Sequence, residues 1–119
     1  MCCSSGTDAL LLGLQGLGIK HLDGVIVPSF TFASSAEAIS ILGGIPIFSD
    51  VDKNTFNLYP EAILKGIQTA KKENIRLKGI MTVGLFGQPC DMEPILEIAK
   101  NNKIWVLDVA AQSFGGKYK

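Results

Sequence analysis

The sequence has no excess of charge of either sign, and it contains a single arginine. Its 119 residues include 11 basic and 11 acidic side chains, so the formal net charge is zero. A protein that grips nucleic acid without regard to base sequence needs a basic surface, and this balance excludes that class of partner. Because Arg76 stands alone, the chain cannot build a phosphate clamp from paired guanidinium groups.

Cysteines are few, and their spacing suits neither a disulfide framework nor a metal. Cys2 and Cys3 are adjacent, an arrangement that rarely satisfies disulfide geometry, and Cys90 is far from both. No metal-type spacing of Cys or His is present. We therefore expect no metal site, and a reduced, cytoplasmic setting.

Long apolar runs are also missing. No stretch is long enough to span a bilayer. The apolar segment 9–14 is reminiscent of a secretory leader, but Asp8 precedes it and no basic residue comes before it. We therefore expect neither a leader nor contact with a membrane.

What the sequence does contain is a regular alternation of two kinds of segment. Short, continuously apolar runs predict strands near 25–28, 45–49, 79–84 and 104–108, and the segments 4–18, 33–44, 60–74 and 91–102 have helical patterns. Strands that are apolar throughout are typical of a parallel sheet buried on both faces. The length allows one domain. The expected fold class is α/β, a three-layer α/β/α arrangement around a mainly parallel sheet.

In such a sheet, ligands bind beyond the carboxyl ends of the strands, here the segments 28–32, 84–88 and 108–112. Gly6 and Thr7 follow the N-cap candidate Ser5, and the free N–H groups of a helix start favour an anion. An ordinary cap is the alternative. Phe32 can stack on a flat heterocycle or serve simply as core packing.

Five blocks at these strand ends carry a resemblance to a known family. They are "SSGTDAL", "VIVPSFTFASSAEAI", "PIFSDVDKNTFNL", "VGLFGQPCDM" and "VLDVAAQSFGGKYK", and together they span nearly the whole chain in order. The sequence resembles the sugar aminotransferases of the DegT/DnrJ/EryC1/StrS family, which use pyridoxal 5'-phosphate (PLP). The resemblance implies part of a fold type I large domain that works as a homodimer. It also implies amino transfer from an amino acid, usually glutamate, to a keto group on a nucleotide-linked sugar.

The resemblance assigns cofactor-binding roles to individual residues. Gly6 and Thr7 would help to hold the cofactor phosphate, and Phe32 would lie over the pyridine ring. Gln112 would form a hydrogen bond near the phenolic oxygen of the cofactor. Thr31 is expected to orient the same loop as Phe32. Gln88 is a weaker candidate, because its Gly-Gln-Pro context also serves as a turn.

One position departs from the family pattern, which is close to Glu-Asp-Ala-Ala-Gln. The family Asp pairs with the pyridine nitrogen and keeps it protonated, so that the ring can accept electrons. Alignment on Gln112 places Asp108 at the family Glu and Val109 at the family Asp. Neighbouring residues of a strand point to opposite faces, so Asp108 is not expected to replace the missing carboxylate.

A second departure concerns the Schiff-base lysine, which the family carries beyond the last block. Lys117 and Lys119 fall in the segment that precedes it. The resemblance therefore implies that residues 1–119 are an internal fragment of the cofactor-binding large domain, without the second domain and without a catalytic residue. We expect this chain alone to be inactive.

Two other interpretations remain open. The chain can be a non-catalytic α/β binding module, since it lacks the lysine and carries Val109 where a charge is needed. It can also belong to a PLP-dependent sugar dehydratase built on the same scaffold. Downstream sequence separates the possibilities, because a Ser-Phe-x-x-x-Lys pattern indicates transamination and a His at the lysine position indicates dehydration.

Overall fold

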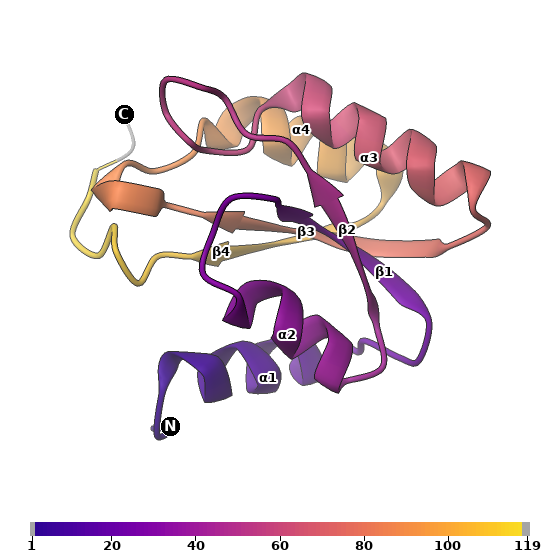
Figure 1. The fold of residues 1–119 in the computed structure, drawn as a ribbon, viewed down its shortest axis with the longest axis horizontal. Helices are drawn as coiled ribbons and strands as arrows, with labels where there is room; N and C mark the ends of the chain where they lie inside the picture. The colour runs from indigo at the N-terminus through magenta and orange to yellow at the C-terminus, as the bar shows by residue number, and fades with distance from the viewer. Residues whose placement is uncertain (1, 118–119) are drawn as a thin grey trace.

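A single four-stranded parallel sheet organises the chain, whose residues 2–117 are described by a computed structural model (Figure 1). Lys119, one of the two lysines in the segment that precedes the family's Schiff-base lysine, lies outside the described residues. The strand order is β2-β1-β3-β4, and every pair of neighbouring strands is parallel. The strands are β1 (Asp23–Pro28), β2 (Ile45–Ser49), β3 (Arg76–Val83) and β4 (Trp105–Val109).

Helices cover both faces of this sheet. They are α1 (Gly6–Gly16), α2 (Ser34–Ile41), α3 (Pro60–Lys72) and α4 (Met92–Asn102), and a short 3-10 turn, η1, spans Leu85–Gly87. Helices α1 and α2 lie on one face, and α3 and α4 lie on the other (Figure 1). This arrangement confirms the predicted three-layer α/β/α fold. Each of these helices, all within residues 2–117, is too short or too polar to cross a bilayer.

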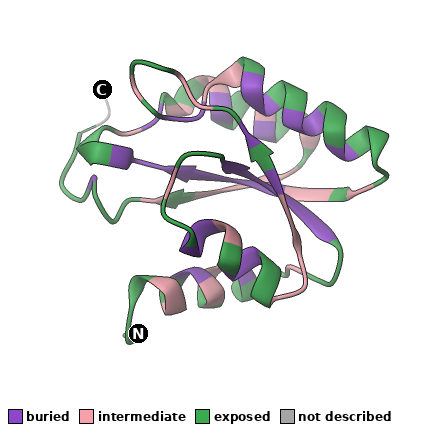
Figure 2. Ribbon diagram, in the orientation of Figure 1, coloured by how far each residue is buried: buried purple, intermediate pink, exposed green. Residues whose placement is uncertain are grey.

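Two apolar cores fill the spaces between the layers. One core, on the α3 and α4 side, includes Ile26 and Ile80 of the central strands, and the other includes Val25 and Met81 beside α1 and α2. Alternate residues of β1 and β3 therefore contribute to opposite cores, which is why both strands are apolar along most of their length. Figure 2 shows the resulting burial of the two central strands.

The helix ends follow from local sequence. Ser5 caps α1, its Oγ accepting a hydrogen bond from the Asp8 N–H at 3.1 Å. Pro60 occupies the first position of α3, where its missing N–H costs no helical hydrogen bond. After α2, the chain turns at Gly43, whose φ of 76° lies in the left-handed region that glycine adopts readily.

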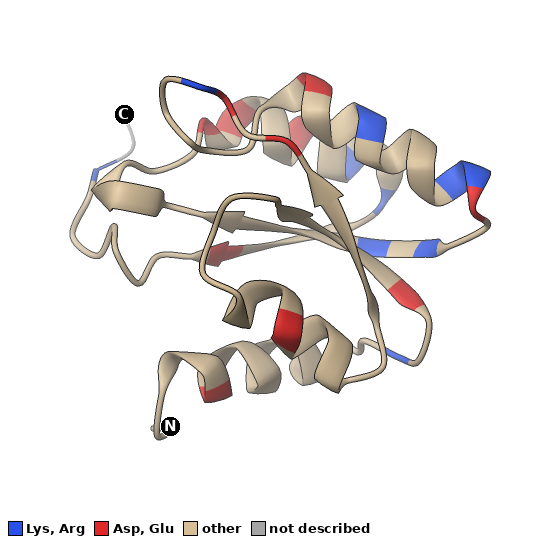
Figure 3. Cartoon of the chain, viewed as in Figure 1, with Lys and Arg blue, Asp and Glu red and all other residues tan. Residues whose placement is uncertain are grey.

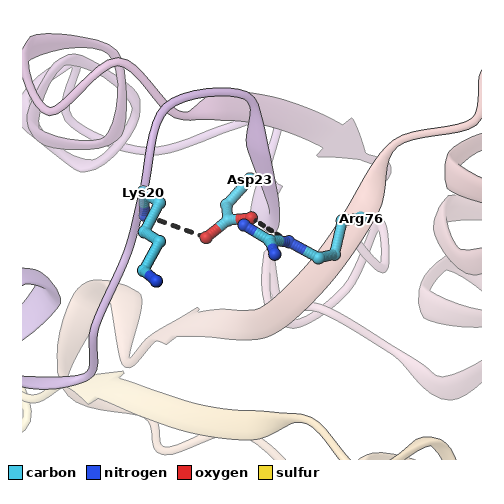
Figure 4. A network of polar contacts seen from close by, with 3 residues as sticks. All are labelled: Lys20, Asp23 and Arg76. Atoms are coloured by element: carbon cyan, nitrogen blue, oxygen red, sulfur yellow. Dashed lines mark hydrogen bonds and ion pairs between the residues drawn. The ribbon is translucent and has the colours of Figure 1, made fainter.

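The central strands begin earlier than their apolar runs indicate. β1 starts at Asp23 and β3 at Arg76, both before the apolar residues that predicted strands from 25 and 79. The buried Asp23 carboxylate accepts hydrogen bonds from the Lys20 backbone N–H at 2.8 Å and from Arg76 Nε at 2.5 Å (Figure 4). Because this pair satisfies a charge at the amino end of the sheet, polar residues can enter both strands there.

Candidate functional site

A pocket of about 320 Å³ opens beyond the carboxyl ends of β3 and β4, on the face of the sheet that α1 and α2 cover. Its wall includes all five residues that the sequence singled out for a cofactor: Gly6, Thr7, Phe32, Val109 and Gln112. These residues come from three separate segments of the chain, the start of α1, the loop after β1 and the end of β4. The fold thus brings them to one place at the edge of the sheet where parallel α/β proteins bind ligands.

The start of α1 forms one wall of this pocket. Ser5 Oγ accepts the N–H of Asp8, and Ser5 O accepts the N–H of Ala9 at 3.0 Å. The two N–H groups that precede them belong to Gly6 and Thr7, which line the pocket. The Asp8 carboxylate accepts from the Ser4 hydroxyl and borders a different hollow, so it does not oppose an anion in this pocket.

The structure adds a residue that the sequence analysis missed. Ser34, the first residue of α2, is 9% exposed and also lines the pocket. Two helix starts, those of α1 and α2, therefore border the same space. The sequence signal was a serine pair opening a helix just after Phe32, but a serine at a helix start is common and does not by itself indicate a ligand.

No charged side chain belongs to the described residues that line the pocket. Helices α1 and α2, both fully described, carry no Lys or Arg, and Figure 3 shows the basic residues on other elements. An anion in this pocket would therefore be held by backbone N–H groups, helix dipoles and hydroxyl groups.

Val109 and Asp108 occupy opposite faces of β4. Val109 packs with the core on the α1 and α2 side and lines the pocket. Val106, two residues before Asp108, packs with the core on the other side of the sheet, so Asp108 lies on that side too. The Asp108 Oδ1 accepts a hydrogen bond from Thr82 Oγ1 at 2.6 Å. Thr82 is fully buried. Its hydroxyl therefore holds Asp108 away from the pocket.

One polar side chain, Gln112, and one aromatic side chain, Phe32, complete the mouth of the pocket. Gln112 Oε1 accepts a hydrogen bond from the Phe86 backbone N–H at 2.8 Å. Phe32 is 76% exposed, so the core-packing interpretation of this residue is wrong. Thr31 lies beside it in the pocket wall, whereas Gln88 lines a neighbouring hollow instead.

The described residues form no metal centre, and the buried thiol of Cys90 is not activated. Among residues 2–117, no three His, Cys, Asp or Glu side chains are grouped to hold a metal ion. Cys90 is buried, and this burial raises the pKa of its thiol from 9.0 to about 11. A thiol with that pKa stays protonated at neutral pH and is a poor nucleophile.

Comparisons with known proteins agree with the fold. The model of the DegT/DnrJ/EryC1/StrS aminotransferase family matches residues 1–119. GDP-perosamine synthase from Escherichia coli O157:H7 is 43% identical over 116 residues, which cover 98% of this chain and 30% of that protein.

Solved structures of other proteins share the fold of this chain. The crystal structure of a DegT DnrJ EryC1 StrS aminotransferase from Brucella abortus matches with a TM-score of 0.93 and 40% identity, over 97% of this chain and 31% of that one. NtdA from Bacillus subtilis, solved with bound cofactor PMP, matches with a TM-score of 0.85 and 37% identity, over 94% of this chain and 24% of that one.

The chain thus spans about 30% of the length of the curated relative that it matches. The family model covers residues 1–119, and therefore every segment that contributes to the pocket. The chain belongs to the DegT/DnrJ/EryC1/StrS aminotransferase family.

Proposed function

We propose that the pocket binds PLP, and that the chain is part of the cofactor-binding large domain of a sugar aminotransferase. The enzyme would move an amino group from an amino acid, with glutamate as the expected donor, to a keto group on a nucleotide-linked sugar. The observation that carries the proposal is the convergence of Gly6, Thr7, Phe32 and Gln112 around one pocket at the carboxyl edge of the sheet, whose described lining residues are all uncharged.

The phosphate end of the cofactor fits the start of α1. Gly6 and Thr7 offer the first two N–H groups of that helix, and the hydroxyl of Thr7 adds a further donor. Ser34 brings a second hydroxyl from the start of α2. These residues would bind the phosphate and orient the rest of the molecule toward β4.

The ring of the cofactor fits the opposite wall. The exposed Phe32 offers an aromatic face on which a pyridine ring can stack. Because Gln112 Oε1 already accepts from Phe86, its Nε2 amino group is the end left to donate a hydrogen bond to a phenolic oxygen. When bound, PLP supplies the electron sink that amino transfer needs.

The fit fails at the pyridine nitrogen. The resemblance places Val109 where the family carries an Asp, and Val109 has no charge to pair with a protonated nitrogen. Burial without a partner disfavours the cation, so the nitrogen would lose its proton in this pocket. Asp108 cannot take over, because it lies on the other face of β4.

Val109 also favours a second candidate function. A pocket that holds the phosphate and the ring but does not protonate the nitrogen suits a binding module without catalysis. Under either function, we propose a cytoplasmic homodimer with shared sites, in which any Schiff-base lysine comes from outside residues 1–119. The chain alone would then be inactive.

The test uses the protein expressed in its complete natural reading frame. With PLP bound, glutamate should convert the cofactor to PMP and release 2-oxoglutarate, which absorbance and an enzymatic 2-oxoglutarate assay follow without any sugar. The aminotransferase proposal predicts this half-reaction, and the Val109→Asp variant should accelerate it. PLP binding without conversion in either form would support the binding module, and no PLP binding at all would contradict both.

A further inference from the structure

The turn 84–88 separates the proposed cofactor pocket from the loop 51–58, and it is held from both sides. On the pocket side, the Phe86 N–H donates to Gln112 Oε1 at 2.8 Å. On the loop side, Asn57 Nδ2 donates to the Gln88 carbonyl oxygen at 2.9 Å. One short segment of backbone therefore connects the amide of Asn57 to the amide of Gln112.

The loop that carries Asn57 is itself firmly folded. The Asp52 carboxylate accepts the backbone N–H groups of Asn54 at 2.8 Å and Thr55 at 2.9 Å, which lower the pKa of Asp52. Val51 and Leu58 form an antiparallel bridge that closes the loop. The backbone of Asn57 is fixed at both polar groups, because its N–H donates to Thr55 Oγ1 and its carbonyl accepts from Asp52.

Burial of Asn57 in this loop lowers the stability of the fold. It is only 4% exposed, and its Oδ1 is buried with no hydrogen-bond partner among the described residues. A buried polar atom without a partner lowers stability. The bond from Nδ2 to the Gln88 carbonyl is therefore the contact that an apolar residue at position 57 could not supply.

The turn needs such support because its backbone is strained. Phe86 has a φ of 57° and its neighbour in space, Phe56, has a φ of 59°, both in the left-handed region that bulky side chains avoid. Their rings meet edge to face, with centroids 5.6 Å apart. Strained residues of this kind persist only where surrounding contacts determine their conformation, and they gather at functional sites.

From these contacts we infer that Asn57 is a positioning residue for Gln112. By holding the Gln88 carbonyl, Asn57 keeps the turn in the conformation that aims the Phe86 N–H at Gln112 Oε1. The Gln112 amide then presents its Nε2 group to the pocket. The part of this inference that concerns a ligand rests on the proposed function, whereas the link between Asn57, Phe86 and Gln112 does not.

The link is tested by hydrogen exchange in the complete protein, with Phe and Ile labelled with ¹⁵N. Asn57→Ala should speed exchange of the Phe86 amide about tenfold, the effect expected from the loss of one supporting hydrogen bond. Gln112→Ala should do the same. The matched control Asn54→Ala lies on the exposed part of the same loop and should change nothing.

The amide of Ile80, buried in β3, reports general loss of stability in the same spectra. Faster exchange at Phe86 with unchanged exchange at Ile80 supports the inference, and an equal rise at both would overturn it. Asn57→Asp, which keeps the size of the side chain but removes the donor, should repeat the result. An unchanged Phe86 amide in both Asn57 variants would also overturn it.

A double-mutant cycle tests the consequence for ligand binding. Asn57→Ala should weaken binding of PMP about tenfold in the parent protein and have no further effect in the Gln112→Ala background. Inorganic phosphate, held at the start of α1, should bind equally well to all four proteins. Additive losses of PMP affinity would overturn the inference. If the parent binds no PMP while the exchange pattern holds, the proposed cofactor is wrong and the positioning of Gln112 stands.

Discussion

The two ends of the sheet handle polar groups in opposite ways. At the amino end, Asp23 is 1% exposed and its carboxylate is fully engaged by Arg76 Nε and the Lys20 N–H. At the carboxyl end, the described residues that line the pocket carry no charge, and they include Gly6 and Thr7, whose N–H groups open α1. One end holds a buried carboxylate against an exposed guanidinium group and a backbone N–H, and the other keeps donors available.

This difference separates stability from function along the strands. A buried ion with its hydrogen bonds complete adds a specific pairing of β1 with β3, which fixes how the two central strands meet. Donors left without a protein partner at a helix start cost little while water reaches them, and they become useful when an anion arrives. Changes at the amino end should therefore alter unfolding, and changes at the carboxyl end should alter binding and rate.

The largest expected effect is a gain at the carboxyl end. Val109→Asp supplies the anion that the proposed cofactor lacks, and the glutamate half-reaction should accelerate by roughly a hundredfold to several thousandfold, equivalent to roughly 3–5 kcal/mol. The rate of 2-oxoglutarate release measures it. Asp108→Asn, on the other face of β4, is the control and should leave the rate unchanged. Equal rates for the Val and Asp forms would show that position 109 does not meet the pyridine nitrogen.

The next effect belongs to the amino end. Arg76→Ala leaves the buried Asp23 carboxylate with the Lys20 N–H alone, and the free energy of unfolding should fall by about 2–3 kcal/mol. Urea unfolding measures the loss. The double variant Asp23→Asn with Arg76→Ala should lose less than Arg76→Ala, because no buried charge remains. The comparison of the two ends breaks down if Arg76→Ala weakens PMP binding without lowering stability.

A smaller effect concerns pH at the buried thiol behind the turn 84–88. Cys90 has a pKa of about 11 in the folded protein against an ordinary value of 9.0, so the unfolded chain releases this proton first. This thiol therefore adds no pH dependence to stability well below pH 9, and the free energy of unfolding that it supports falls by about 1–2 kcal/mol as the pH rises from 9 toward 11. Unfolding in urea across this range, for the parent and for Cys90→Ala, isolates the contribution. A parent curve that parallels the Cys90→Ala curve contradicts it.

The smallest effect is a loss of affinity at the start of α1. Thr7→Ala removes one hydroxyl from the pocket wall, and binding of inorganic phosphate or PMP should weaken by about fivefold to tenfold, the value of one hydrogen bond. Calorimetric titration measures it, and the urea midpoint should stay near that of the parent. Thr69→Ala, which removes an exposed hydroxyl from α3, is the matched control. Equal losses of phosphate affinity in both variants would remove the special role of α1.

Much of this fold could be predicted because its determinants are local. The predicted strand 45–49 coincides with β2, and Pro60 starts α3 where expected. The pairing of Asp23 with Arg76 could not be predicted, since the two residues lie 53 positions apart and neither carries a sequence pattern. Both therefore begin strands that the apolar runs placed later.

The site divides in the same way. That Gly6, Thr7 and Phe32 lie at one edge of the sheet could be predicted, because strand ends and helix starts are visible in the sequence, whereas their cofactor roles come only from the family resemblance. The bonds from Asn57 to Gln88 and from Phe86 to Gln112 join residues 31 and 26 positions apart, and they depend on the left-handed backbone of Phe86. No local pattern specifies a bulky residue in that conformation.

The strand order has a consequence for synthesis on the ribosome. Val25 of β1 pairs with Pro46 on one side, but on its other side it pairs with Gly79, which is translated much later. A nascent chain that has completed only β1 and β2 therefore presents an unpaired apolar edge until β3 emerges. Parallel pairings between distant segments form slowly, and such an edge invites other strands. Chaperones that bind extended apolar segments should thus engage this chain during the interval between β2 and β3.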